Sequence, residues 1–173
     1  MVEKVDWIWL DGQFVPWDDA KVHVLTHSLH YGFAVFEGIR CYGQGGNRAA
    51  VFCLDEHLKR FYNSAHICTL DIPFDRATIT TACLEAVKRN GLLDGCYLRP
   101  IAFMGAGAMG LGARDNPIQV AIAAWRWGAY LGDEGLKNGI RCQISSFRRP
   151  RGDALLAKGK ITQEMIRMLS SWR

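Results

Sequence analysis

The sequence predicts an α+β fold, in which strands and helices follow one another in mixed order and pack as layers. Two apolar runs of strand length, two segments with apolar residues at helical spacing and several tight-turn signals predict this fold. The chain has 173 residues, of which 49% are apolar, which is enough for one core and the start of another.

Two hairpins are expected near the N-terminus. The first spans Asp6–Trp17, where apolar runs flank Asp11-Gly12, a pair that favours the positive φ angles of a two-residue turn. The second joins the apolar runs Phe33–Tyr42 and Ala50–Leu54 through the glycine-rich tip Gly43–Asn47.

Two helices are expected after these hairpins. Asp55 is the expected N-cap of the first, which runs to Leu70, because an aspartate side chain accepts hydrogen bonds from the free amides of a first turn. Asp75 is the expected cap of the second, which Asn90-Gly91 should end. The apolar residues at helical spacing are Leu58, Phe61, Ala65 and Cys68, and then Ile79, Cys83, Ala86 and Val87.

Strands dominate the rest of the prediction. Cys96–Met104 and Ile118–Trp125 are expected to be buried strands, and Ile140–Phe147 alternates as a further strand. Between them, Trp127–Asn138 is polar and contains glycine, which is typical of a connector. The predicted units are an α+β domain at residues 1–126, a connector at 127–138 and the start of a second domain at 139–173.

Composition indicates a cytoplasmic protein. The six cysteines include no C-x-x-C pair, and several lie in apolar runs as small buried hydrophobes. The segment Met1–Trp17 lacks the basic and apolar regions of a secretory signal, and no apolar run is long enough to span a membrane. The net charge of +4 comes with no nucleic-acid motif, so neither nucleic acid nor membrane is an expected partner.

Two motifs are rejected. Gly105–Gly110 fits G-x-G-x-x-G, but Leu111–Pro117 cannot form the helix that a dinucleotide site requires, so a flexible loop beside a site is expected. His27 and His30, with Glu37 nearby, lack the ligand spacing of a metal site. These histidines are expected to cap or brace a turn.

Charged residues leave several alternatives open. Arg60 on the first helix is either a surface arginine, which its spacing favours, or a phosphate ligand, because guanidinium matches phosphate oxygens. Arg99 lies inside an apolar strand, where it either lines a site or forms a structural ion pair. Lys158 and Lys160, taken alone, are typical surface lysines; a catalytic lysine needs burial or cationic neighbours.

Seven segments of the chain together carry a family pattern: Trp7–Gly12, Asp19–Val24, His30–Gly32, Val35–Tyr42, Glu56–Arg60, Tyr97–Pro100 and Trp127–Gly132. In this order they resemble the branched-chain aminotransferases, which are fold-type IV pyridoxal-phosphate enzymes. The resemblance covers residues 5–162 and implies the N-terminal domain of the D-amino-acid aminotransferase-like fold, with only the start of the second domain.

The resemblance implies a pyridoxal 5'-phosphate cofactor and amino-group transfer between leucine, isoleucine or valine and 2-oxoglutarate. Lys160, seven residues after Asp153, matches the Schiff-base lysine and is chosen over Lys158, and Arg60 matches the ligand of the cofactor phosphate. It implies small amino acids and 2-oxo acids as partners and a homodimer. The positions that match the substrate pocket are Tyr31, which reaches the partner subunit's site, Phe36, Gly38, Arg99, Trp127 and Tyr130.

The pattern changes after Thr162. Met165 stands where the family has a tyrosine that bonds the cofactor's phenolic oxygen, and no acid matching the partner of the pyridine nitrogen follows. A truncated or frameshifted gene, and no measurable transamination by these 173 residues alone, are therefore expected. One alternative is a D-amino-acid transaminase or aminodeoxychorismate lyase, which Arg99 and the segment Trp127–Gly132 argue against. The other is a truncated domain without catalysis.

Overall fold

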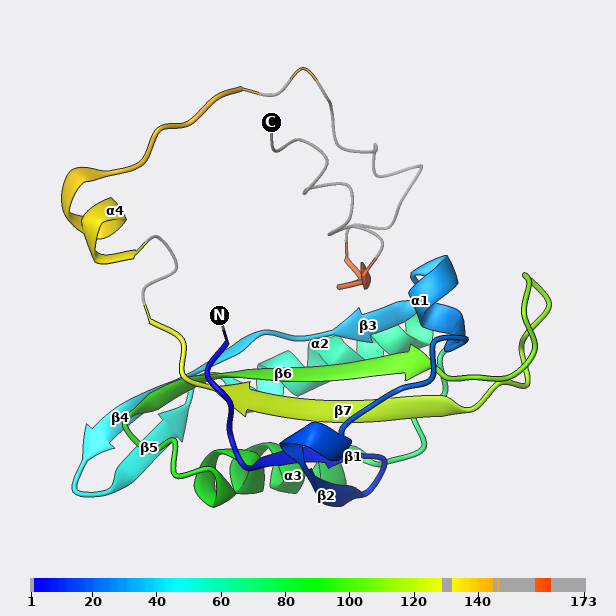
Figure 1. The fold of residues 1–173 in the computed structure, drawn as a ribbon, viewed down its shortest axis with the longest axis horizontal. Coiled ribbons are helices and arrows are strands. Elements are labelled where there is room, and N and C mark those ends of the chain that lie inside the picture. The colour runs from blue at the N-terminus through cyan, green and yellow to red at the C-terminus, as the bar shows by residue number, and fades with distance from the viewer. Residues whose placement is uncertain (1, 129–131, 145, 147–157, 163–173) are drawn as a thin grey trace.

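The computed structural model describes residues 2–128, 132–144, 146 and 158–162 (Figure 1). Its strands are β1 (Trp7–Leu10), β2 (Gln13–Pro16), β3 (Ala34–Phe36), β4 (Ile39–Gly45), β5 (Arg48–Val51), β6 (Gly95–Met104) and β7 (Ile118–Trp125). Its helices are η1 (Trp17–Asp19), α1 (His27–Tyr31), α2 (Leu54–Ile67), α3 (Arg76–Arg89) and α4 (Gly132–Asn138).

One antiparallel sheet organises these elements. The strand order is β2-β1-β7-β6-β4-β5, and β3 pairs with β6 at the end away from β4. Helices α2 and α3 pack on one face of the sheet (Figure 1), and the core between them contains Leu58, Phe61, Ile79 and Leu98. Because side chains alternate along a strand, Tyr97 and the other odd-numbered residues of β6 point to the face opposite this core.

The first predicted hairpin is confirmed. Strands β1 and β2 pair from Trp7 with Pro16 to Leu10 with Gln13, and the two turn residues have φ angles of 46° and 97°. The Asp11 carboxylate also accepts a hydrogen bond of 2.7 Å from the Val120 amide, so the turn is attached to β7.

The second hairpin is confirmed with two corrections. Strand β4 extends to Gly45, so the tip is shorter than the predicted Gly43–Asn47. The predicted continuous run Phe33–Tyr42 is divided into β3 and β4 by Glu37 and Gly38, although both strands pair with β6.

The helices follow the periodicity, but one cap was predicted wrongly. Cys53, with a left-handed φ of 47°, is the N-cap of α2, and Asp55 lies in the first turn instead. There its carboxylate still interacts favourably with the helix dipole. For α3 the prediction is confirmed: Asp75 accepts a bond of 2.8 Å from the Thr78 amide, and Asn90 is the C-cap.

The prediction for the chain beyond β7 was partly wrong. The expected strand Ile140–Phe147 is absent from its described residues, 140–144 and 146, because a strand needs a hydrogen-bonded neighbour and these residues pair with none of the described strands. The expected connector Trp127–Asn138 contains helix α4. The division into units at 1–126, 127–138 and 139–173 stays a prediction. Among the described helices, none is long and apolar enough to span a bilayer.

Candidate active site

Lys160 lies where a late segment of the chain returns to the sheet. Its carbonyl accepts a hydrogen bond of 3.2 Å from the Phe36 amide, and Val35 and Ile161 form an isolated bridge. Its own amide donates to the Ser64 hydroxyl at 2.9 Å. Lys160 is therefore half-buried against β3 and α2, whereas Lys158 is exposed.

Ser64 connects this lysine to helix α2. Its side chain is fully buried, and the hydroxyl that accepts from the Lys160 amide donates at 2.8 Å to the Arg60 carbonyl, one turn earlier in the helix. The buried hydroxyl is thus used as both a donor and an acceptor, and its hydrogen atom is paired. The backbones of the two residues expected to hold a cofactor are therefore joined through one side chain.

Arg60 is paired with a buried acid. Its Nε and Nη2 atoms donate to the two carboxylate oxygens of Glu37 at 2.6 and 2.7 Å, and His57 Nδ1 lies 2.8 Å from the same carboxylate. Burial of Glu37 raises its pKa, but the hydrogen bonds from Arg60 and His57 outweigh burial and lower the pKa below its usual value. The hydrogen bond to Glu37 correspondingly raises the pKa of Arg60.

Arg99 faces the aromatic side of the sheet. Its guanidinium carbon lies 4.8 Å from the centroid of the Phe36 ring and 5.3 Å from that of Tyr97, whose hydroxyl accepts a hydrogen bond of 3.1 Å from Nη2. Its Nε atom is buried and has no hydrogen-bond partner in the described part of the chain. The Phe36 and Tyr97 rings and the Tyr97 hydroxyl therefore contact Arg99 in place of the ion-pair partner considered from the sequence. The buried Nε–H of Arg99 is left for another acceptor.

Gly38 is required by its neighbour Tyr97. A Cβ atom at this position would lie 1.8 Å from the Tyr97 hydroxyl oxygen, so any side chain would displace the group that Arg99 contacts. Trp127 completes the wall, with its ring 4.5 Å from that of Tyr97, and its carbonyl accepts a hydrogen bond of 3.1 Å from Arg40. The predicted pocket residues Phe36, Gly38, Arg99 and Trp127 thus come together with Lys160, whose Nζ lies 5.1 Å from the Phe36 centroid.

Two predicted residues are not part of this group. Tyr31 stacks on His27 in α1, at 4.3 Å between centroids, and lines a separate open cavity of about 840 Å³. Its predicted role at a partner subunit's site stays a prediction. Tyr130 lies outside the described residues.

The two histidines of the rejected metal motif make the bracing contacts that were predicted for them. His27 Nε2 contacts the Gly110 carbonyl and His30 Nε2 the Val24 carbonyl, both at 2.9 Å, so the two histidines brace neighbouring loops. Among the described residues, no cluster of side chains could hold a metal ion. The glycine motif connects β6 to β7 without a following helix, so the dinucleotide interpretation stays rejected.

Four residues of the site were missed from the sequence: Glu37, His57, Ser64 and Tyr97. Only Glu37 gave a usable signal, since an acid inside an apolar strand needs a charged partner. A serine in a helix and a tyrosine in a strand are both ordinary, and nothing in their spacing distinguishes them.

Comparisons with known proteins identify the family of the chain. A family model described as amino-transferase class IV matches residues 34–171. The branched-chain-amino-acid aminotransferase of Pseudomonas aeruginosa is 44% identical over 162 residues, which are 92% of this chain and 52% of that protein. The protein of the same name from Escherichia coli K12 is 42% identical and is covered over 47% of its length.

Solved structures support the fold. A branched-chain amino acid aminotransferase with pyridoxamine 5'-phosphate, from the organism abbreviated T.th., superposes with a TM-score of 0.87 at 44% identity, over 96% of this chain and 54% of that chain. The chain spans about half the length of the curated relatives it matches. The predicted α+β fold is confirmed, and because the family model matches most of its residues, the chain belongs to the class IV aminotransferase family.

Proposed function

We propose that the described site is part of a pyridoxal-phosphate-dependent branched-chain amino-acid aminotransferase, which transfers an amino group between leucine, isoleucine or valine and 2-oxoglutarate. One observation carries the proposal. The Arg99 guanidinium carbon and Lys160 Nζ lie 4.8 and 5.1 Å from the centroid of the same Phe36 ring, so a carboxylate-binding cation and a nucleophile are both next to one aromatic side chain. Two curated relatives that the chain resembles are both named branched-chain-amino-acid aminotransferase, which supports a branched-chain amino acid as the substrate.

The residues present fit a phosphate-bearing cofactor. Arg60 is half-exposed, and its Nη1 atom makes no hydrogen bond to the described residues, so it can donate to a phosphate while Glu37 holds the other side. Lys160 supplies the amine that would bond the cofactor covalently. When bound, pyridoxal phosphate supplies an electron sink for charge that develops on the substrate carbon.

The protein's own groups divide the remaining work. Lys160 Nζ moves the proton to and from the substrate carbon, as a general base and then as a general acid. Arg99, through its unpartnered Nε, binds the second carboxylate of a glutamate-type substrate. The rings of Phe36 and Trp127, together with Tyr130, would contact an aliphatic side chain, and Gly38 keeps the Tyr97 hydroxyl in place.

A labelling experiment tests this proposal. Borohydride reduction after incubation with pyridoxal phosphate should fix the cofactor on Lys160, and peptide mapping identifies the modified residue. Lys160→Ala should abolish the label, while Lys158→Ala, two residues away and exposed, should retain it. Label on Lys158 in the unsubstituted chain would contradict the assignment.

Assembly and location belong to the same proposal. Apolar side chains are exposed on α1 and on the loop between β6 and β7, where Leu29 is 63% and Leu111 93% exposed, and a second copy of the chain would cover them. All six cysteines are free, as expected in a reducing cytoplasm. Sedimentation equilibrium should give a homodimer; a monomer at all concentrations would contradict that part.

A further inference from the structure

Glu37 is a fully buried carboxylate at the edge of the proposed cofactor site. Its side chain is 0% exposed, and both oxygens accept hydrogen bonds from Arg60, with His57 as a further contact. Its amide also donates to the Pro100 carbonyl at 2.9 Å, so the backbone that carries the acid is held by β6. The carboxylate is therefore a fixed point against which a more mobile side chain can be oriented.

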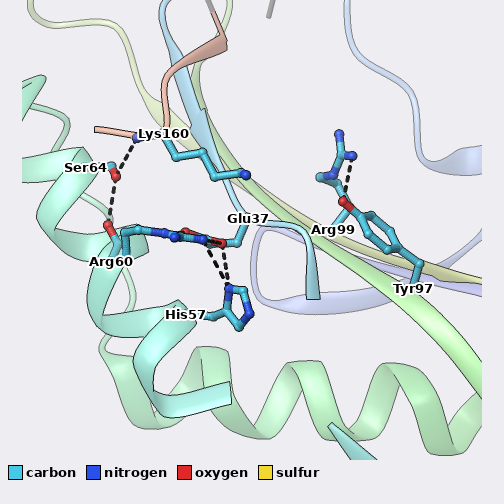
Figure 2. Close-up of polar contacts among 7 residues, drawn as sticks. All are labelled: Glu37, His57, Arg60, Ser64, Tyr97, Arg99 and Lys160. Carbon is cyan, nitrogen blue, oxygen red and sulfur yellow. Dashed lines mark hydrogen bonds and ion pairs between the residues drawn. The ribbon is translucent and has the colours of Figure 1, made fainter. Parts of the chain in front are cut away.

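Among the described residues, those that contact the Arg60 guanidinium lie along one of its edges. Nε and Nη2 face Glu37, which leaves the N–H groups of Nη1 for another acceptor, and the side chain is 49% exposed. Figure 2 shows Arg60 and Lys160 extending in the same direction from the junction at Ser64, with Glu37 and His57 beside the guanidinium. Arg60 and Lys160 thus extend from one backbone junction, and Glu37 contacts the Nε and Nη2 atoms of Arg60 but not Nη1.

We propose that Glu37 is a positioning residue, which holds Arg60 in the one orientation that presents Nη1 to the phosphate group of the cofactor. The inference rests on the proposed function, because it names the residue behind the phosphate anchor. A half-exposed arginine without this contact would lose rotamer freedom on binding phosphate. With Glu37 present, the ordering takes place when the protein folds, so binding is stronger.

A competing effect has the opposite sign. The Glu37 carboxylate also neutralises Arg60, and this weakens the attraction for a phosphate dianion. If neutralisation dominates, removing the charge should strengthen phosphate binding; if positioning dominates, it should weaken binding. Positioning is expected to dominate, because Glu37 contacts two donors of the same rigid fork and a planar guanidinium binds oxyanions only in a defined orientation.

Inorganic phosphate is the probe for this test, because it reports on Arg60 without involving Lys160. Phosphate titrations of the full chain are followed by NMR at the Arg60 Nε–H signal, which an Arg60→Lys variant identifies. Glu37→Gln keeps the shape and removes the charge, and it should weaken phosphate binding about tenfold, about the value of one charge-assisted hydrogen bond. Equal or tighter binding by Glu37→Gln would overturn the proposal.

Two controls separate position from charge and from general damage. Glu37→Asp keeps the charge but shortens the reach by one methylene, so positioning predicts weaker binding and neutralisation predicts no change. Glu85→Gln removes a partly exposed acid that pairs with Lys88 and Arg89 on α3, and it should bind phosphate as the unsubstituted chain does. If Glu37→Gln does not fold, the unsubstituted protein still tests the positioning role. Slow exchange of the Arg60 Nε–H proton with water before phosphate is added supports it, and fast exchange overturns it.

The outcomes for the two proposals can be told apart. Phosphate binding that depends on Glu37, without cofactor attachment to Lys160, supports the positioning role and contradicts the proposed function. Cofactor attachment to Lys160, with phosphate binding unaffected or strengthened by Glu37→Gln, supports the proposed function and overturns the positioning role.

Discussion

Helices α2 and α3 are both 14 residues long and pack against the same sheet, but the side chains that they bury differ in polarity. The buried residues of α3 are Ile79, Ala82, Cys83, Ala86 and Val87. Helix α2 buries Leu58, Phe61 and Ala65 and, among them, the hydroxyl of Ser64. It also directs His57 and Arg60 to the buried Glu37. One helix therefore contributes packing alone, whereas the other contributes packing and a polar network whose partners come from distant segments.

The largest expected effect tests the packing helix. Ile79→Ala on α3 removes a fully buried side chain and should lower the free energy of unfolding by about 2–5 kcal/mol. Leu84→Ala, on the same helix but 48% exposed, should cost about 1 kcal/mol or less. Urea denaturation measures both. Phosphate affinity of folded Ile79→Ala should equal that of the unsubstituted chain. A loss of affinity would contradict the conclusion that α3 contributes packing and not phosphate binding.

The second prediction concerns the polar network of α2. Arg60→Ala leaves the Glu37 carboxylate buried with His57 as its remaining contact, and it should lower the free energy of unfolding by about 2 kcal/mol. This is less than for a fully buried pair, because the Arg60 side chain is half-exposed. Lys88→Ala breaks an exposed pair with Glu85 on α3 and should stay within about 0.5 kcal/mol. Equal effects in urea denaturation would show that burial of Glu37 does not matter.

A smaller effect is expected from two matched hydroxyls. Ser64 on α2 and Thr80 on α3 both donate at 2.8 Å to the carbonyl four residues earlier, but only Ser64 also accepts from the Lys160 amide. Ser64→Ala should therefore cost about 1 kcal/mol, and Thr80→Ala should stay within about 0.5 kcal/mol. Hydrogen exchange at residues 158–162 should rise in Ser64→Ala alone; unchanged exchange there would show that the contact does not hold the segment.

The last prediction uses pH. The pKa of Glu37 is lowered below its ordinary value of 4.5, so the folded state binds a proton less readily than the unfolded chain does. Its contribution to stability is fully present above about pH 4.5 and is lost as pH falls through the lower folded-state pKa. Stability measured by urea denaturation should therefore fall faster with acid in the unsubstituted chain than in Glu37→Gln. Parallel pH profiles would contradict the ion pair.

Local features were predictable because neighbouring residues decide them. The Asp11-Gly12 turn was predictable because both residues readily adopt positive φ angles. The Asp75 cap was predictable because an aspartate side chain binds the amide three residues later, here that of Thr78. Family resemblance, not spacing, selected Arg60 and Lys160. The cap of α2 was misplaced at Asp55, because a left-handed cysteine at the cap position gives no signal in the sequence.

The sequence by itself determined the α+β class, the two long helices and the two central strands, since their periodicities depend only on residues within one element. The tertiary structure alone decided that Glu37 pairs with Arg60 and that Gly38 lies against Tyr97. It also decided that Ser64 accepts a hydrogen bond from Lys160, which is 96 residues later in the chain. It also decided that residues 140–144 form no strand with the described sheet. The reason is physical: a hydrogen bond or a close contact between distant residues depends on how whole elements pack, and no periodicity within one element contains that information.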